Sequence, residues 1–161
     1  MKTCLVVFYS RTGITQKVAN EIAKAADCDL EQIRDVKPRT GWLGYLRSGY
    51  EVMTEHLPAI QPVLRNPADY DLVILGTPVW VDNISAPMRR YIADNKNRFN
   101  RIATFCTMGG SQGNQALSTM AKLCEKQPIA QLSLNDKQIE SQQHLDQVAN
   151  FVKSLAAEFA H

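Results

Sequence analysis

The chain has 161 residues, of which 45% are hydrophobic and 21% are charged, and its formal net charge at pH 7 is +2. This length and composition predict a single globular domain, residues 1–161, and exclude a disordered or fibrous protein. The positive charges are spread along the sequence, so nucleic acid is not an expected partner. We find no apolar stretch long enough for a membrane span and no signal peptide pattern, which favours a cytoplasmic location.

Four cysteines lie far apart, without a Cys-x-x-Cys pair and without clustered histidines: Cys4, Cys28, Cys106 and Cys124. This spacing is typical of buried, reduced thiols. We therefore assign neither a metal site nor a dithiol redox centre.

The first elements in the chain are a buried strand, Leu5–Phe8, and an amphipathic helix that begins at Ile14. The run Ser10-Arg11-Thr12-Gly13-Ile14-Thr15 joins them, and its hydroxyls surround a glycine that can adopt positive φ. Free N–H groups and the positive end of the helix dipole would add to a phosphate site. The loop matches neither a nucleoside-triphosphate nor a dinucleotide motif, which favours a terminal phosphate monoester. An N-capped helix start is the alternative interpretation.

The next segments are less regular. Leu30–Ile33 is a weak strand, typical of a sheet edge. Residues 37–62 are expected to form an extended helical crossover, longer than a simple connection needs. The aromatic residues within 41–50 either cover the sheet, which we favour, or line a substrate cleft or a dimer contact.

The second half of the chain repeats the alternation of strand and helix. Leu72–Leu75 is an unbroken apolar run, as expected of a central parallel strand, and a loop over 76–80 follows it. Ile102–Cys106 is a further strand, followed by a glycine-rich turn over 107–114. Ile129–Leu134 alternates with polar residues and predicts the second edge of the sheet, before a final helix.

Five strands alternating with helices predict an α/β fold with a three-layer, doubly wound, five-stranded parallel sheet. The strand order should be 2-1-3-4-5, because strands one, three and four have the apolar character of buried strands. In that order a ligand crevice forms at the carboxyl ends of strands one and three. The hydroxyl-rich loop and both later loops should meet there.

Three motifs at this crevice resemble the flavodoxin family, in its short-chain type. Ser10–Thr15 is similar to the family's phosphate loop, Gly76–Trp80 to its ring-stacking loop, and Thr107–Gly110 to its third flavin loop. The resemblance implies FMN as the cofactor, with Trp80 over one face of the flavin and Arg11 directed at the phosphate. The residues that it implies in cofactor binding are Ser10, Arg11, Thr12, Gly13, Ile14 and Thr15; Thr77, Pro78, Val79 and Trp80; and Thr107, Met108, Gly109, Gly110, Gln112 and Gly113.

Two departures from the family pattern bear on function. Met108 stands in the third loop where many flavodoxins have a second aromatic residue, so one face of the flavin is expected to be open to a substrate. The sequence pI of 8.4 also differs from the strongly acidic electron carriers, and charge guides the choice of partner.

The leading hypothesis is therefore an FMN-dependent oxidoreductase. It would pass reducing equivalents from NAD(P)H or a protein reductase to a quinone or a similar acceptor, and the flavin would do the chemistry, so no catalytic side chain is assigned. The alternatives are a one-electron carrier that docks on protein partners, and a flavodoxin-shaped module that binds a phosphate or a protein without flavin. The oligomeric state is open, and a homodimer is one option.

Overall fold

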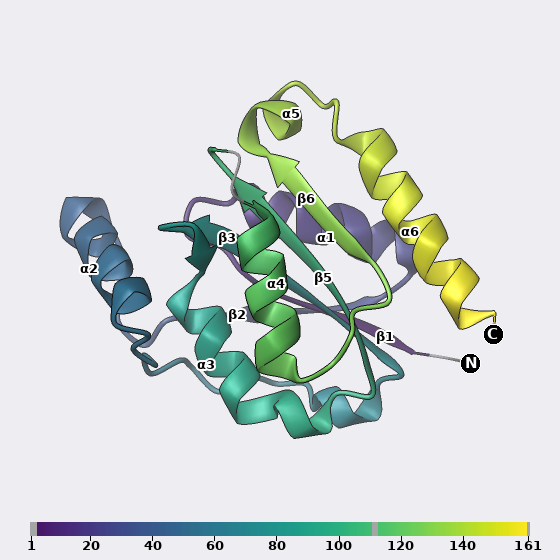
Figure 1. Ribbon diagram of the computed structural model, residues 1–161, viewed down its shortest axis with the longest axis horizontal. Coiled ribbons are helices and arrows are strands. Elements are labelled where there is room, and N and C mark those ends of the chain that lie inside the picture. The colour runs from purple at the N-terminus through teal and green to yellow at the C-terminus, as the bar shows by residue number, and fades with distance from the viewer. Residues whose placement is uncertain (1–2, 111–112, 161) are drawn as a thin grey trace.

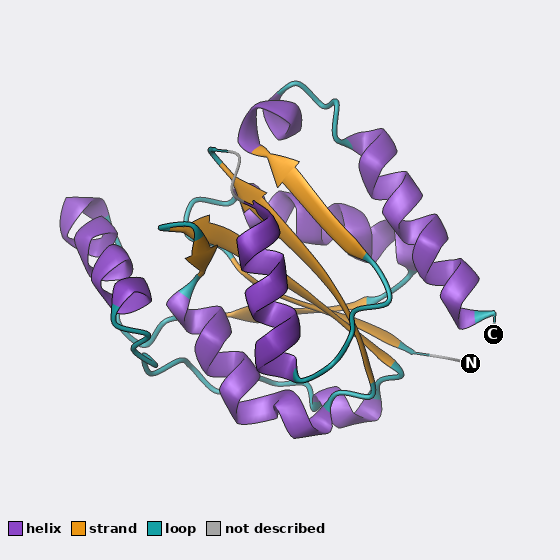
Figure 2. Ribbon diagram, in the orientation of Figure 1, coloured by secondary structure: helices purple, strands orange, loops and turns teal. Residues whose placement is uncertain are grey.

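A parallel sheet lies between two layers of helices in the computed structural model, which describes residues 3–110 and 113–160 (Figures 1 and 2). The strand order is β2-β1-β3-β5-β6, which confirms the predicted order of 2-1-3-4-5. These strands are β1 (Cys4–Tyr9), β2 (Asp29–Ile33), β3 (Leu72–Trp80), β5 (Arg101–Met108) and β6 (Gln131–Asn135). A sixth, two-residue strand, β4 (Asn83–Ile84), pairs antiparallel with the end of β3, so the predicted count of five was one too low.

The helices divide between the two faces of the sheet. The α-helices are α1 (Ile14–Ala26), α2 (Gly41–Met53), α3 (Ala86–Asn95), α4 (Gly113–Cys124), α5 (Asp136–Glu140) and α6 (Leu145–Phe159). Helices α1 and α6 cover one face and α3 and α4 the other, whereas α2 stands apart from both layers (Figure 1). The short helix α5 was not predicted. Across the described ranges, no helix is both long and apolar enough to cross a membrane.

Strand β1 shows how the apolar runs produce this arrangement. Leu5 and Val7 pack in the cluster that includes α3 and α4, while Val6 and Phe8 pack in the cluster that includes α1 and α6. Successive side chains of a strand point to opposite faces, so a strand covered on both faces must be apolar at every position. This pattern made the central strands recognisable in the sequence.

Two strands are longer than expected, and the difference concerns the loops assigned to the site. Strand β3 runs to Trp80 and β5 to Met108, so residues 77–80 and 107–108 belong to strands. Pro78 is tolerated in β3 because the pairing with β1 has already ended at Gly76. Gly76 itself is required, since a Cβ there would lie 2.0 Å from the ring of Phe105.

The cysteine prediction was wrong for one pair. Cys4 and Cys28 form a disulfide, with Cα atoms 4.7 Å apart. The parallel register pairs Leu5 with Asp29, so the residues just before them, Cys4 and Cys28, lie side by side. The two cysteines are 24 positions apart in the sequence, so their spacing did not indicate a disulfide. Cys106 and Cys124 are free and buried, as predicted, and burial raises the pKa of Cys106 to about 11.

Candidate functional site

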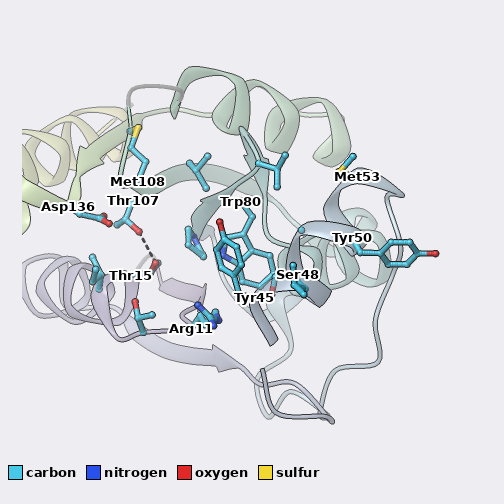
Figure 3. Close-up of a pocket in the computed structure, with 18 residues that line it drawn as sticks. Arg11, Thr15, Tyr45, Ser48, Tyr50, Met53, Trp80, Thr107, Met108 and Asp136 are labelled. Carbon is cyan, nitrogen blue, oxygen red and sulfur yellow. Dashed lines mark hydrogen bonds between the residues drawn. The ribbon is translucent and has the colours of Figure 1, made fainter. Parts of the chain in front are cut away.

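A pocket of about 600 Å³ opens where β1, β3 and β5 end (Figure 3). This volume is typical of a site for a small molecule or a cofactor. The β1–α1 loop, the ends of β3 and β5, and helix α2 form its walls. The lining residues are Arg11, Thr12, Ile14, Thr15, Tyr45, Leu46, Ser48, Gly49, Tyr50, Met53, Pro78, Val79, Trp80, Val81, Thr107, Met108, Gly109 and Asp136.

The N-terminus of α1 at this pocket has the features of an anion site. Its N-cap is Gly13, with φ of 96° and no side-chain cap. A Cβ there would meet nothing within 4 Å, so the positive φ, and not a lack of space, favours glycine. Ser10 Oγ accepts a hydrogen bond of 3.0 Å from the Gly13 N–H and so shapes the turn. The N–H groups of the first helical turn have no intrahelical partner and fit a phosphate.

A hydrogen bond between two threonines joins this loop to the end of β5. The Oγ1 atoms of Thr15 and Thr107 lie 2.8 Å apart, and both side chains are buried (Figure 3). The residues are 92 positions apart in the sequence. The phosphate-loop motif and the third-loop motif therefore meet in one site.

Trp80 is held on its two sides by residues from other elements. The ring of Tyr9 meets it edge-on, with centroids 5.4 Å apart and an interplanar angle of 89°. The guanidinium carbon of Arg39 lies 5.2 Å from the centroid of the indole ring. Trp80 lines the pocket and Arg39 does not, so the indole separates this cation from the pocket.

Arg39 is the centre of a buried polar network that the sequence analysis missed. Its side chain is only 1% exposed; Nε donates to Asp35 Oδ1 at 2.9 Å, and Nη2 donates to Glu51 Oε2. Tyr9 Oη donates to Asp35 Oδ2 at 2.6 Å, and burial, then this bond, raises the pKa of Tyr9. Arg39 Nη1 also donates to Ser48 Oγ at 3.3 Å. The network ties α2 to the sheet behind Trp80, and its contacts with Tyr9, Ser48 and Glu51 join residues too far apart for a local motif.

Arg11 lines the pocket, and its side chain contacts the start of α2. Its Nε donates to the carbonyl of Arg39 at 3.2 Å and its Nη2 to that of Gly41 at 3.1 Å. Its guanidinium carbon also lies 5.8 Å from the centroid of the Tyr45 ring. These two carbonyl groups lie just before α2 and at its first residue, so Arg11 fixes the start of α2.

The favoured prediction for α2, that its aromatic residues cover the sheet, was wrong. The side of the helix that faces the protein carries Gly44, Ser48, Glu51 and Val52. A Cβ on Gly44 would lie 2.4 Å from the backbone of residue 39, so only glycine allows this close approach. The large apolar side chains face outward, and four of them line the pocket: Tyr45, Leu46, Tyr50 and Met53.

Some residues assigned to cofactor binding from the sequence do not line the pocket. Thr77 is fully buried, and its Oγ1 accepts from the Ser85 N–H at 3.0 Å, so it fixes the start of α3. Gly113 allows close packing, because a Cβ there would lie 2.3 Å from Ser133 Oγ. Gln112 lies outside the described residues. Of the described residues assigned to the cofactor, those absent from the lining are Ser10, Gly13, Thr77, Gly110 and Gly113.

Asp136 is a pocket residue that the sequence analysis did not name. It opens α5, beyond the end of β6, and lines the pocket together with Gly109. Burial, and to a smaller extent Glu140, raises the pKa of its carboxyl group. The sequence feature that could have identified this position is the capping box of Asn135 and Gln138, which marks the start of a helix.

Comparisons with known proteins agree with this geometry. The family model for flavodoxin matches residues 3–155, so the chain belongs to the flavodoxin family. No curated protein matches it.

Several solved structures share the fold. A flavoprotein of Lactobacillus acidophilus NCFM, crystallised in complex with FMN, is 20% identical with a TM-score of 0.71, over 88% of this chain and 98% of the other. A protein of Bacteroides eggerthii assigned as a flavoprotein is 25% identical with a TM-score of 0.73, over 92% and 99% of the two chains. One of Bacteroides uniformis is 22% identical with a TM-score of 0.75, over 94% and 98%.

Proposed function

We propose that this FMN-binding flavodoxin-like protein is an oxidoreductase that passes reducing equivalents from NAD(P)H or a protein reductase to a quinone or a similar flat acceptor. Family membership supports FMN as the cofactor. The pocket supports it independently, because the uncapped N-terminus of α1, through Thr12, Ile14 and Thr15, lines the same cavity as Trp80. These features suit a phosphate group and a flat ring, respectively.

The residues that would hold FMN belong to three walls of the pocket. First-turn N–H groups of α1, with the hydroxyl of Thr12, would bind the phosphate. Trp80 would cover one face of the ring, with Pro78 and Val79 along its edge, and the segment from Thr107 to Gly109 would meet the polar end. When bound, FMN supplies the electron transfer, and the chain binds it, orients it and limits its contact with water.

The observation that favours an enzyme is the composition of the remaining wall. Helix α2 contributes apolar side chains there, including Tyr45 and Leu46, and β5 contributes Met108. This wall continues beyond Trp80 and would accept a second flat apolar molecule beside the flavin. A net charge of +2 also differs from the strongly acidic balance that steers an electron carrier toward basic redox proteins.

Steady-state turnover of NADH or NADPH with a quinone tests this function, with the visible spectrum recorded first to establish that FMN is fully bound. We expect turnover at a saturable rate. A protein that carries FMN but does not turn over would contradict the enzyme, and reduction by a protein reductase in two separate one-electron steps would then favour the carrier. Colourless protein that ignores added FMN would overturn both functions.

A further inference from the structure

Helix α2 turns its apolar residues toward solvent. Its outward side chains are between 55% and 75% exposed: Trp42, Leu43, Tyr45, Leu46, Tyr50 and Met53. Its buried side carries two small residues, a carboxylate and one apolar residue: Gly44, Ser48, Glu51 and Val52. An isolated surface helix normally has the opposite arrangement, with its apolar stripe against the core. We call these six outward residues the α2 face.

The orientation of α2 is fixed by polar contacts. Glu51 accepts from Arg39 on one oxygen and from Arg47 Nε at 3.0 Å on the other. Ser48 Oγ accepts from Arg39 at 3.3 Å. Rolling the helix to bury the α2 face would separate these groups and leave the buried Arg39 without a partner on this helix, at a high cost in free energy. The exposure of the α2 face is therefore built into the fold.

The turn between β3 and β4 extends this apolar surface. Val81 has φ of 48° and Asp82 has φ of 59°, as in a tight hairpin turn that usually contains asparagine or glycine. A β-branched residue with positive φ is strained, yet the side chain of Val81 is 58% exposed. A Cβ on Gly49 of α2 would lie 3.8 Å from Val81, so the two surfaces adjoin. Strained residues cluster at functional sites, and Val81 lies both at the pocket and beside the α2 face.

The size and charge of this surface indicate what covers it. Seven large apolar side chains, each more than half exposed, amount to roughly 800 Å², which is what one partner buries in an interface of standard size. Arg47 already pairs with Glu51, so α2 offers no free charge to recognise a charged partner. It also lacks the series of lysines and arginines that holds an amphipathic helix on a membrane. An uncharged apolar face is compatible with a copy of itself.

We propose that the α2 face is the contact between two copies of this chain, with α2 of one copy packed against α2 of the other across a two-fold axis. Such an interface uses the same patch twice, and homodimer interfaces are the more apolar class. Four residues of the α2 face also line the pocket, so the second copy covers the outer wall of the site: Tyr45, Leu46, Tyr50 and Met53. The contact shares this wall with the proposed acceptor site, and the mass of the protein in solution tests it separately from redox activity.

The mass of the FMN-loaded protein in solution tests the proposal, by light scattering or sedimentation from about 1 to about 100 μM. We expect twice the 18.0 kDa of one chain. Leu43→Glu alters a residue of the α2 face that is 65% exposed and does not line the pocket, so it should leave the monomer folded. Because it places like charges on both halves of the interface, it should raise the dimer dissociation constant about 100-fold or more.

Leu64→Glu is the matched control, since Leu64 is 93% exposed and lies outside both α2 and the pocket. It should leave the dimer intact. Hydrogen exchange of residues 41–53 gives a second measurement without mutation, and protection there should rise with protein concentration. A wild-type monomer throughout this range, or a dimer that Leu43→Glu leaves unchanged, overturns the proposal. A monomer that binds neutral lipid vesicles through Trp42 would overturn it in favour of a membrane contact.

Discussion

Trp80 is in contact with Arg39 and with Tyr9, and both of these residues bond to parts of the protein outside the pocket. The guanidinium of Arg39 lies over the indole ring, and the ring of Tyr9 stands perpendicular to it. Asp35 accepts hydrogen bonds from both. The orientation of the residue proposed to cover the flavin therefore depends on a buried ion pair that does not itself reach the pocket.

Replacing Arg39 should destabilise the protein and also loosen Trp80. Arg39→Met removes the cation and leaves Asp35 and Glu51 as buried carboxylates with fewer partners, so we expect a loss of about 3 kcal/mol in the free energy of unfolding. Urea unfolding followed by circular dichroism measures this loss. The double variant with Glu51→Gln should lose less than the sum of the single changes, because the two residues interact directly. Strict additivity would contradict the pairing.

Asp136 should make stability depend on pH. Its pKa is raised in the folded protein, mainly by burial, so the folded state binds this proton more tightly than the unfolded state does. The ionised carboxylate therefore costs stability at neutral pH, and the cost disappears as the pH falls below the ordinary aspartate value of about 4. Asp136→Asn should be more stable than the wild type at neutral pH, and the two should converge in acid. Parallel stability curves over this range would refute the assignment.

At the scale of elements, the start of α1 carries one threonine proposed to bind the phosphate and another that stabilises the fold. Thr12 is exposed at the pocket, whereas the hydroxyl of Thr15 is buried against Thr107. Thr12→Ala should weaken FMN binding by about 1 to 3 kcal/mol and leave the stability of the apoprotein unchanged. Thr15→Ala should reduce both affinity and stability. Fluorescence titration with FMN and thermal unfolding measure the two effects, and unchanged affinity in both variants would remove the phosphate assignment.

The secondary structure near this site was predictable wherever the cause was local. The apolar runs of β1 and β3 and the stripe of α1 follow from strand and helix periodicity, and Gly13 from the demand for positive φ. The environment of α2 was not predictable, because Arg39 selects its inward face through contacts with Ser48 and Glu51. Periodicity alone could not show that the helix buries its small and polar residues.

At the scale of the whole molecule, one covalent link joins the edge of the sheet to its interior. The Cys4–Cys28 disulfide closes a loop of 24 positions between β1 and β2. A loop of this length predicts a stabilisation of about 3 kcal/mol, chiefly by restricting the unfolded chain. Reductant should therefore lower the urea midpoint of the wild type. The double variant Cys4→Ala, Cys28→Ala should start from the lower midpoint and show no response to reductant.

The strand order could be predicted from the sequence, whereas the disulfide could not. The amino-acid composition of a strand shows whether it is central, since a strand buried on both faces must be apolar throughout. Which residues of adjacent strands lie side by side depends on register, and nothing near Cys4 or Cys28 in the sequence records it. The same limit applies to Thr15 and Thr107, whose contact appears only once the sheet has formed.

The position of Trp80 gives this protein a natural optical probe. The chain has two tryptophans, and the other, Trp42, lies on the outer side of α2. In a Trp42→Phe background all indole emission comes from Trp80, whose intensity and colour respond to the guanidinium beside it. Because Arg39 also anchors α2, any detachment of that helix would be seen directly as a change in emitted light, without an added dye.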